Sequence, residues 1–522
     1  MSLLLRLLFF RILMRVLLMY RAWGFISLRL PLTISSIRFD FSIILDKIAL
    51  IGVGLVLLIS GCVFIFSYKY IEADHNEGRF ALILGSFVLS ILLLLIRNSI
   101  PFLLLGWDGL GITSFLLIIY YDRKTNNRSG IITFSVNRLG DAVIIGNLVF
   151  FVTYGHIRIG VYLGIYLCLI YIIVAITKRA QYPFSMWLPL AMDAPTPVSA
   201  LVHRRTLVTA GLFFLARLVP ERLNVYLCFI GGLTLCVGGV CAIFSSDLKK
   251  LIANSTLSNL GLIMITLAIC NKTLIMFHLF THALFKAGLF MIAGTILVNS
   301  FGAQDGRRIY NSLRLSPIIR ACISAFFISS AGIFFLSTFY SKHHIVIMCQ
   351  SYSINSLGVI LIFLGVFLRT LYSLRFAFIM VGDKYITVMN AEIPLEIKWS
   401  IFVLAGCSII YGNSYNISFI YSTFCYEVPV LLVMILGLVL FLVRNMNINR
   451  VLFTSIFYID TIMDVIYKKN NLDMVRVIDS GFGSLESRRY KNIMQIRPGR
   501  LISNRVNISA LLLFTFLMVL FI

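Results

Sequence analysis

The residues best suited to chemistry are the few charged side chains that interrupt long apolar runs. The motif GWDGLG places Asp108 inside one run, and Lys178 ends another just before a series of prolines. A charge within a membrane span costs roughly 2.5–3.5 kcal/mol, so such residues usually face a partner, water or an ion path. Burial favours neutral lysine, whereas a nearby carboxylate favours the cation. We therefore expect Asp108 and Lys178 to be candidates for a pair that loads and releases a proton.

A second group occurs at helical spacing. FHLFTHALFKAGLF places His278, His282 and Lys286 at i, i+4 and i+8, on one helix face. Two such histidines suit a metal or one side of a haem site, but no third ligand follows at suitable spacing. Histidine titrates near neutral pH, so three titratable groups in file favour a proton path. A membrane redox enzyme with haem on His278 or His282 is the alternative, which a haem optical band would support.

Two further motifs carry charge. In NRLGD, Arg138 and Asp141 are three residues apart, so they share a helix face and can pair. An ordinary ion pair at a helix end is the alternative interpretation. In FYSKHH, Lys342 follows an apolar run that contains Ala331 and Gly332. A buried lysine whose partner approaches and withdraws can switch its proton occupancy.

The stretch from Thr177 to Gly211 must position part of this chemistry. Proline breaks helices, and four prolines fall here, along with His203. In lipid, the freed backbone groups must be satisfied inside the protein or by water in a cavity. We therefore interpret this broken, charged stretch as a functional centre.

The composition defines the fold class. Hydrophobic residues make up 60% of the 522 residues, charged residues 13%, and the mean hydropathy is +0.96. Apolar runs of about 20 residues, each long enough to cross a bilayer, recur throughout. We predict an all-α polytopic membrane bundle of about 14–16 transmembrane helices with discontinuous helices. A short similarity between HRRTLVTAGLFF and HALFKAGLFM suggests inverted repeats of the transporter type.

Between the last two spans the sequence becomes polar and amphipathic. Asp460, Asp464 and Lys468 recur every four residues, which predicts a helix lying along the membrane or a neighbour. An extramembrane loop is the alternative. The predicted parts are an N-terminal transmembrane segment and loop (1–43), a transmembrane core (44–445), the lateral helix (446–505) and a C-terminal anchor (506–522).

Charge and cysteines exclude other classes. The net charge is +24, but the basic residues lie largely in loops and tails, where they meet lipid head groups or set topology; we expect no nucleic acid. The ten cysteines are scattered without a CxxC pair, which argues against zinc, iron–sulfur ligation or disulfides. We expect no bound metal.

Several motifs together resemble a known family. WLPLAMDAPTPVSALVH, TLVTAG, GWDGLG, NRLGDA, DLKKLIANSTLSNLGL, FHLFTHALFKAGLFM and FYSK are similar to NADH dehydrogenase subunit 5 of respiratory complex I, which is related to Mrp-type antiporter subunits. The resemblance is close over the residues numbered 45 to 380 and weaker towards the C-terminus. There, Arg450–Arg505 corresponds to the family's long lateral helix.

The resemblance implies roles for single residues. Asp108 matches the family's membrane carboxylate, usually glutamate, and Lys178 matches its paired lysine. Lys342 matches the distal lysine, and Arg138 with Asp141 matches a supporting ion pair. The central polar axis is matched by His203, His278 and His282, with Lys286 close by.

The resemblance also implies a setting. The chain would be a proton-translocating subunit of NADH:ubiquinone reductase in the mitochondrial inner membrane, with the redox chemistry elsewhere. It would bind no cofactor; FMN, iron–sulfur clusters and ubiquinone would be held by other subunits. Its partners would be the neighbouring antiporter-like subunits along the lateral helix, accessory subunits and lipids such as cardiolipin. An independent Mrp-like cation/proton antiporter and a purely structural membrane subunit are the alternatives.

The sequence departs from the family in several places. His343 stands where an aspartate usually follows the lysine, which removes a carboxylate partner of Lys342. Phe334 replaces a usual proline, so we expect a less interrupted second broken helix.

Some departures are arginines. Arg204 and Arg205 stand where the family usually has small residues, commonly serine. Some mitochondrial genetic codes read certain arginine codons as serine or another residue. We hypothesise that several arginines in the printed sequence result from translating the gene with the wrong genetic code: Arg6, Arg11, Arg15, Arg204 and Arg205.

Overall fold

The computed structural model divides the chain into two compact units, and all residues described below belong to the first, Met1–Ile456. The predicted lateral helix, the C-terminal anchor and His203 lie outside the described residues. The described residues are 26–34, 37–72, 74–96, 100–153, 165–201, 211, 224–268, 272–300, 302–306, 317–332, 337–351, 356–381 and 393–414.

A two-stranded antiparallel hairpin opens the described chain. Strands β1 (Ile26–Ile34) and β2 (Ile37–Leu45) pair with Ile34 opposite Ile37. Both segments alternate apolar with other residues, the period-2 pattern of a strand. The hairpin lies where the sequence predicted a loop, whereas the predicted N-terminal transmembrane segment falls almost entirely outside the described residues.

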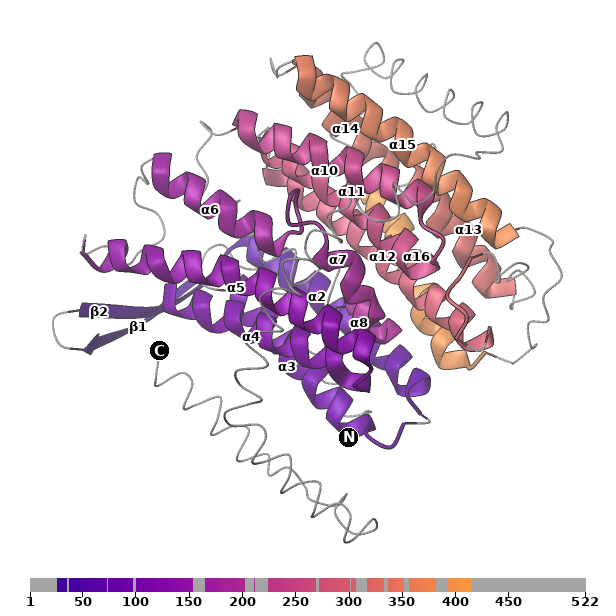
Figure 1. Ribbon diagram of the computed structural model, residues 1–522, viewed down its shortest axis with the longest axis horizontal. Helices are drawn as coiled ribbons and strands as arrows, with labels where there is room; N and C mark the ends of the chain where they lie inside the picture. Colours follow the sequence, from indigo (N-terminus) through magenta and orange to yellow (C-terminus); the bar gives the residue numbers. More distant parts are fainter. Residues whose placement is uncertain are drawn as a thin grey trace, which may run out of the picture. The chain divides into compact units, whose positions relative to one another are not determined.

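The rest of the described chain is helical, as predicted (Figure 1). The helices are α2 (Lys47–Tyr70), α3 (Glu77–Leu95), α4 (Ile100–Ile118), η1 (Ile119–Tyr121), α5 (Lys124–Thr153), α6 (Ile165–Lys178), α7 (Trp187–Leu190), η2 (Ala191–Asp193), α8 (Thr196–Leu201), α10 (Asn224–Phe244), α11 (Leu248–Ala268), α12 (Lys272–Asn299), α13 (Pro317–Ala331), α14 (Ser337–Ser351), α15 (Ser356–Val381) and α16 (Leu395–Ser414).

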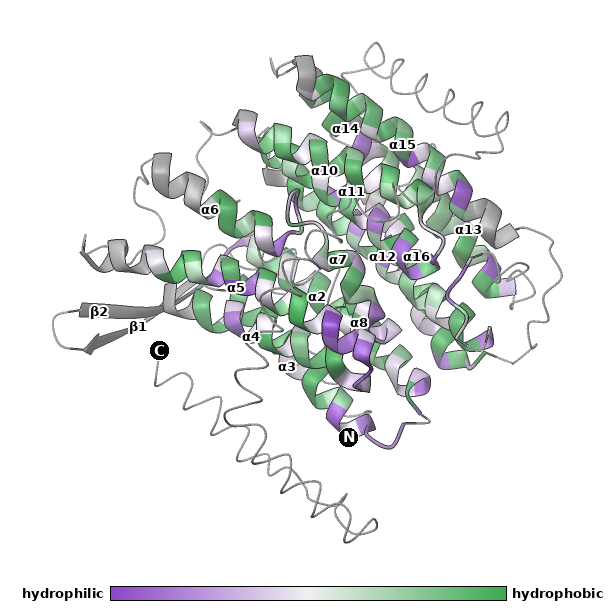
Figure 2. Ribbon diagram, viewed as in Figure 1, coloured by the Kyte–Doolittle hydropathy of each residue, from purple (hydrophilic) through white to green (hydrophobic). Residues whose placement is uncertain are grey.

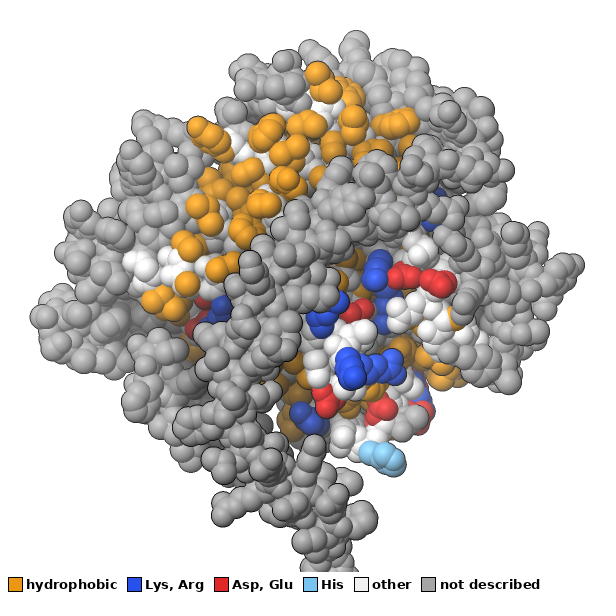
Figure 3. All heavy atoms as spheres, in the orientation of Figure 1, with side chains coloured by type: hydrophobic (Ala, Val, Ile, Leu, Met, Phe, Trp, Pro, Cys, Tyr) orange, Lys and Arg blue, Asp and Glu red, His pale blue; other side chains and the backbone are white. Residues whose placement is uncertain are grey.

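Seven helices among the described residues are long and apolar enough to cross a membrane. They are Ala49–Tyr70, Glu77–Leu95, Leu103–Tyr121, Tyr226–Phe244, Leu248–Ala268, Leu274–Asn299 and Gly358–Phe376. Figure 2 shows mostly hydrophobic helices interrupted by hydrophilic positions. On the face in Figure 3, described hydrophobic side chains gather in one area and charged ones in another, as expected of a multi-pass membrane protein.

Helices α11 and α12 form the buried centre of the described bundle. In their most apolar windows, 100% of the α11 residues and 94% of the α12 residues are buried. Glycines let α10 approach α11 closely: a Cβ on Gly261 would lie 2.6 Å from the Gly231 carbonyl oxygen, and one on Gly238 would lie 2.6 Å from the Ser258 nitrogen. Small residues at helix contacts are typical of membrane bundles.

The broken stretch begins where α6 ends. Ala180 is left-handed (φ 52°), and the Gln181 N–H donates to the Ile176 carbonyl at 3.1 Å. This hydrogen bond is the one that closes a Schellman motif. The Trp187 indole donates to the Thr177 carbonyl at 2.9 Å, and Gln181 Oε1 accepts from Thr234 on α10. The predicted break is therefore confirmed, and the protein itself satisfies these backbone groups.

Candidate functional site

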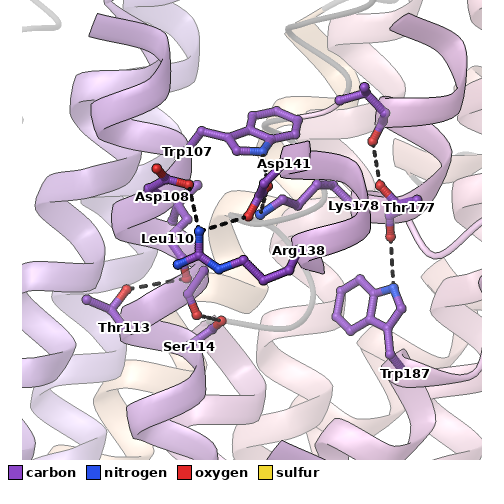
Figure 4. A network of polar contacts seen from close by, with 12 residues as sticks. Trp107, Asp108, Leu110, Thr113, Ser114, Arg138, Asp141, Thr177, Lys178 and Trp187 are labelled. Carbon is purple, nitrogen blue, oxygen red and sulfur yellow. Dashed lines mark hydrogen bonds and ion pairs between the residues drawn. The ribbon is translucent and has the colours of Figure 1, made fainter. Parts of the chain in front are cut away.

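Lys178 and Asp141 form a buried ion pair between α6 and α5. Lys178 Nζ lies 3.2 Å from Asp141 Oδ1, and the two side chains are only 2% and 4% exposed. The Trp107 indole of α4 donates to the same oxygen at 2.7 Å, and its ring lies 5.0 Å from Lys178 Nζ. Figure 4 shows the three side chains converging. Buried charges need such partners, because desolvating an ion costs several kcal/mol.

Arg138 joins the second oxygen of Asp141 to Asp108. Its Nη1 lies 3.6 Å from Asp141 Oδ2 and 3.4 Å from Asp108 Oδ1, as the dashed lines in Figure 4 show. Arg138 and Asp108 are 37% and 25% exposed. The predicted pairing of Arg138 with Asp141 is confirmed. The charges thus run from a partly exposed end to a buried end at Lys178.

The candidate pairing of Asp108 with Lys178 is wrong as a direct contact. Asp141 holds the Lys178 ammonium instead, and Arg138 holds Asp108. The reason is the close approach of α5 to α6. A Cβ on Gly140 would collide with Thr177 Oγ1, so the glycine lets the two helices approach at this point. Asp141 follows Gly140 and Lys178 follows Thr177, so this approach brings the two charged side chains together.

The predicted file of titratable groups on α12 is buried and held by hydroxyls. His278 Nδ1 lies 3.0 Å from Ser341 Oγ on α14, and Lys286 Nζ donates to Ser255 Oγ on α11 at 2.5 Å. The rings of His278 and His282 stack with centroids 6.3 Å apart. Among the described residues, no group of three His, Cys, Asp or Glu side chains is placed to hold a metal ion.

Lys342 lies at a second interruption, between α13 and α14. Its Nζ donates to the Ser330 carbonyl at 2.6 Å, and Thr338 Oγ1 donates to the Ser329 carbonyl. Gly332 follows α13 in the left-handed region (φ 79°), and its Cβ position would be 3.1 Å from Lys342 Nζ. Helix α13 ends before Gly332. The interruption is therefore present, with a glycine after the end of α13, whereas Phe334, on which the expectation of a less interrupted helix rested, lies outside the described residues.

Our interpretation of the sequence missed several polar partners. Trp107 precedes Asp108 in GWDGLG, yet an indole gives no charge signal. Ser255 and Ser341 look like ordinary helix serines, and only the structure shows them against Lys286 and His278. Lys249, in the quoted DLKK motif, donates to the Ala194 carbonyl at 3.1 Å and so ties α11 to the broken stretch.

Family models match two parts of the chain. Residues 98–368 match the model described as NADH:quinone oxidoreductase/Mrp antiporter, TM. Residues 32–81 match the model described as NADH-Ubiquinone oxidoreductase (complex I), chain 5 N-terminus. The first match spans all the site residues described above.

Similar proteins agree with these models. NADH-ubiquinone oxidoreductase chain 5 of Anopheles quadrimaculatus is 37% identical over 454 residues, covering 82% of this chain and 77% of the relative. The protein of the same name from Lumbricus terrestris is 38% identical over 393 residues, covering 73% and 68%.

A solved structure has the same fold. A chain of the Mrp complex from Dietzia sp. DQ12-45-1b matches with a TM-score of 0.73 at 21% identity. The match covers 97% of this chain but only 58% of that one. Taken together, the motifs, the fold and these relatives show that the chain belongs to the NADH-ubiquinone oxidoreductase chain 5 family.

Proposed function

We propose that this chain is a proton-translocating subunit in the membrane arm of a respiratory NADH:ubiquinone oxidoreductase of the mitochondrial inner membrane. The observation that carries this proposal is the buried Lys178–Asp141 ion pair, continued by Arg138 and Asp108. Ionisable groups within a membrane bundle usually mark an ion or proton path. Family membership selects respiratory proton transfer from among the transport functions that this fold supports.

Asp141 has two positively charged neighbours, Lys178 and Arg138, so its carboxylate can move closer to one or the other. When it lies on Lys178, the ammonium keeps its proton because the two charges attract. When Asp141 shifts towards Arg138, Lys178 loses its counter-charge and passes a proton onward. Asp108, which also contacts Arg138, sets how strongly Arg138 draws Asp141. A charge change near Asp108 thereby controls the proton at Lys178.

The onward acceptors are the titratable groups of α12 and α14. His278, Lys286 and Lys342 are buried and contact hydroxyls or a backbone carbonyl. Groups with neutral partners do not have to break an ion pair before they change charge. His282, stacked on His278, extends the file, and His203 belongs to it by resemblance.

The redox reaction takes place outside this chain under this proposal. The site residues suit proton transfer, and no cofactor is assigned to them. FMN, iron–sulfur clusters and ubiquinone belong to other subunits. Neighbouring antiporter-like subunits contact the predicted lateral helix (446–505), accessory subunits complete the assembly, and anionic lipids such as cardiolipin meet the basic loops.

Proton pumping by the assembled, reconstituted enzyme tests the proposal. With Lys178→Ala, we expect proton uptake per NADH oxidised to fall, while NADH oxidation by an artificial acceptor persists. Lys250→Ala is the matched control, because Lys250 is 45% exposed and pairs with Asp247 at 3.3 Å. Unchanged pumping with Lys178→Ala would support a purely structural role. Cation exchange without NADH would support an independent antiporter.

A further inference from the structure

Two arginines in the described helical bundle lack the partners that a buried guanidinium needs. Arg179, directly after Lys178, is 0% exposed, and Arg369 on α15 is 1% exposed. Among the described residues, Nε and Nη2 of Arg179 make no hydrogen bond. The guanidinium of Arg369 forms no ion pair with any of these residues, and the neutral phenol of Tyr372 is its polar neighbour. Buried charges in proteins are almost always paired or hydrogen-bonded.

The surroundings of Arg179 are tight and neutral. Within the described part of the chain, the polar contact of its guanidinium is from Nη1 to Met264 Sδ at 2.7 Å, shorter than most N–H···O bonds although sulfur is the larger atom. Gly211 lies against the aliphatic part: a Cβ there would be 2.8 Å from Arg179 Cγ. A thioether cannot neutralise a guanidinium.

Arg369 lies in a part of the chain that is nearly free of acids. Asp305 is the only acidic residue between Leu248 and Gly382. The phenol of Tyr372, on the same helix, contacts Arg369 and lies 3.1 Å from Ser258 Oγ, but as a neutral group it supplies no counter-charge. Lys342 and His278 are also close enough to feel the charge of Arg369. The helices around Arg369 thus bring further basic groups and no counter-charge.

Arg138 shows what a supported arginine looks like in the same bundle. It is 37% exposed, contacts two carboxylates and lies 4.9 Å from the Phe134 ring centroid. Arginine's planar fork suits carboxylates, and a cation gains from an aromatic face. No carboxylate of the described residues contacts either buried arginine, so the difference lies in the site and not in the residue type.

We infer that positions 179 and 369 carry serine in the assembled protein, because the organism's code reads their codons as serine. Serine needs no counter-charge, and at position 369, inside α15, its hydroxyl can bond to a carbonyl of its own helix. Ser373 on α15 does so, donating to the Thr370 carbonyl at 2.8 Å, and Ser329 donates to the Phe326 carbonyl at 2.8 Å. The hypothesis made for Arg204 and Arg205 thus extends to two buried positions by an independent, structural criterion.

The assignment changes the electrostatics of the polar row. A fixed guanidinium at 369 would repel any proton arriving at Lys342 or His278. With hydroxyls at 179 and 369, the row has no permanent charge at these two positions. Lys178, His278 and Lys342 are then the nearby groups that can change their charge. The chemistry of the row then depends on mobile protons and not on permanent charges.

Peptide masses from the native, assembled complex test the inference, independently of whether it pumps protons. We expect fragments carrying serine at 179 and 369 and arginine at 138, with trypsin cleaving after 138 but not after the other two. Chymotryptic digestion supplies overlapping fragments, so a missing tryptic peptide decides nothing alone. Arginine found at either position overturns the assignment there. In the gene, positions 179 and 369 should carry a type of codon that is absent from position 138. The same codon at 138 and at either of the other positions would also overturn the assignment.

Discussion

The two polar regions of the bundle handle charge in different ways. Around α4 to α6, two carboxylates, Asp108 and Asp141, face two cations, Arg138 and Lys178, so the formal charge is balanced. Around α11 to α15, basic groups meet hydroxyls and carbonyl oxygens, and the helices themselves contain no acid. The first region can change by exchanging partners. The second can change only by gaining or losing protons.

Asp141→Asn should have the largest effect, because Asp141 is the shared partner of Lys178, Arg138 and Trp107. Removing one member of a buried pair costs about 3–5 kcal/mol. We expect proton pumping to be abolished and the membrane arm to assemble less well, measured by reconstitution and native gels. Asp247→Asn is the control, since Asp247 pairs with the exposed Lys250. Normal pumping with Asp141→Asn would break the distinction between the regions.

Gly332→Ala should have the next largest effect, at the interruption before α14. The left-handed backbone and the contact with Lys342 Nζ together predict a loss of about 1–3 kcal/mol. Gly302→Ala separates the two causes, because Gly302 has φ 80° but nothing within 4 Å of its Cβ position. Thermal dissociation of the membrane arm measures both. Equal losses would mean that crowding of Lys342 contributes nothing.

Ser341→Ala removes the hydroxyl that contacts His278. A lost hydrogen bond is worth about 0.5–1.5 kcal/mol, so we expect a several-fold slower proton transfer and little change in assembly. Ser400→Ala is matched, because the buried Ser400 donates only to the Ile397 carbonyl of its own helix. Equal rates for the two variants would remove Ser341 from the proton path.

Asp108→Asn should have the smallest effect on stability. Its partner Arg138 keeps Asp141, and partly exposed ion pairs contribute about 0–1 kcal/mol. We expect normal assembly with reduced coupling of pumping to NADH oxidation. A loss of assembly as large as that of Asp141→Asn would show that Asp108, and not Asp141, anchors the acidic region.

The sequence predicted the features that depend on composition and local spacing. The helical bundle, the break after Lys178 and the file of His278, His282 and Lys286 follow from apolar length, proline and a period of four. The partner of Lys178 did not follow, because pairing between helices depends on their rotation and on the approach that Gly140 permits. Trp107 was missed because a neutral donor carries no charge pattern.

The end of α6 has a mechanical consequence for the lysine it carries. Lys178 is the last helical residue, and Ala180 holds its left-handed backbone at a cost of about 1–2 kcal/mol. If Ala180 returned to helical dihedral angles, α6 would lengthen into the next residues and release the Gln181 bond to Ile176. Because Lys178 lies within the turn that this bond closes, releasing the bond would loosen the backbone that presents Nζ to Asp141. The backbone dihedral angles of Ala180 thus help to hold the ion pair together.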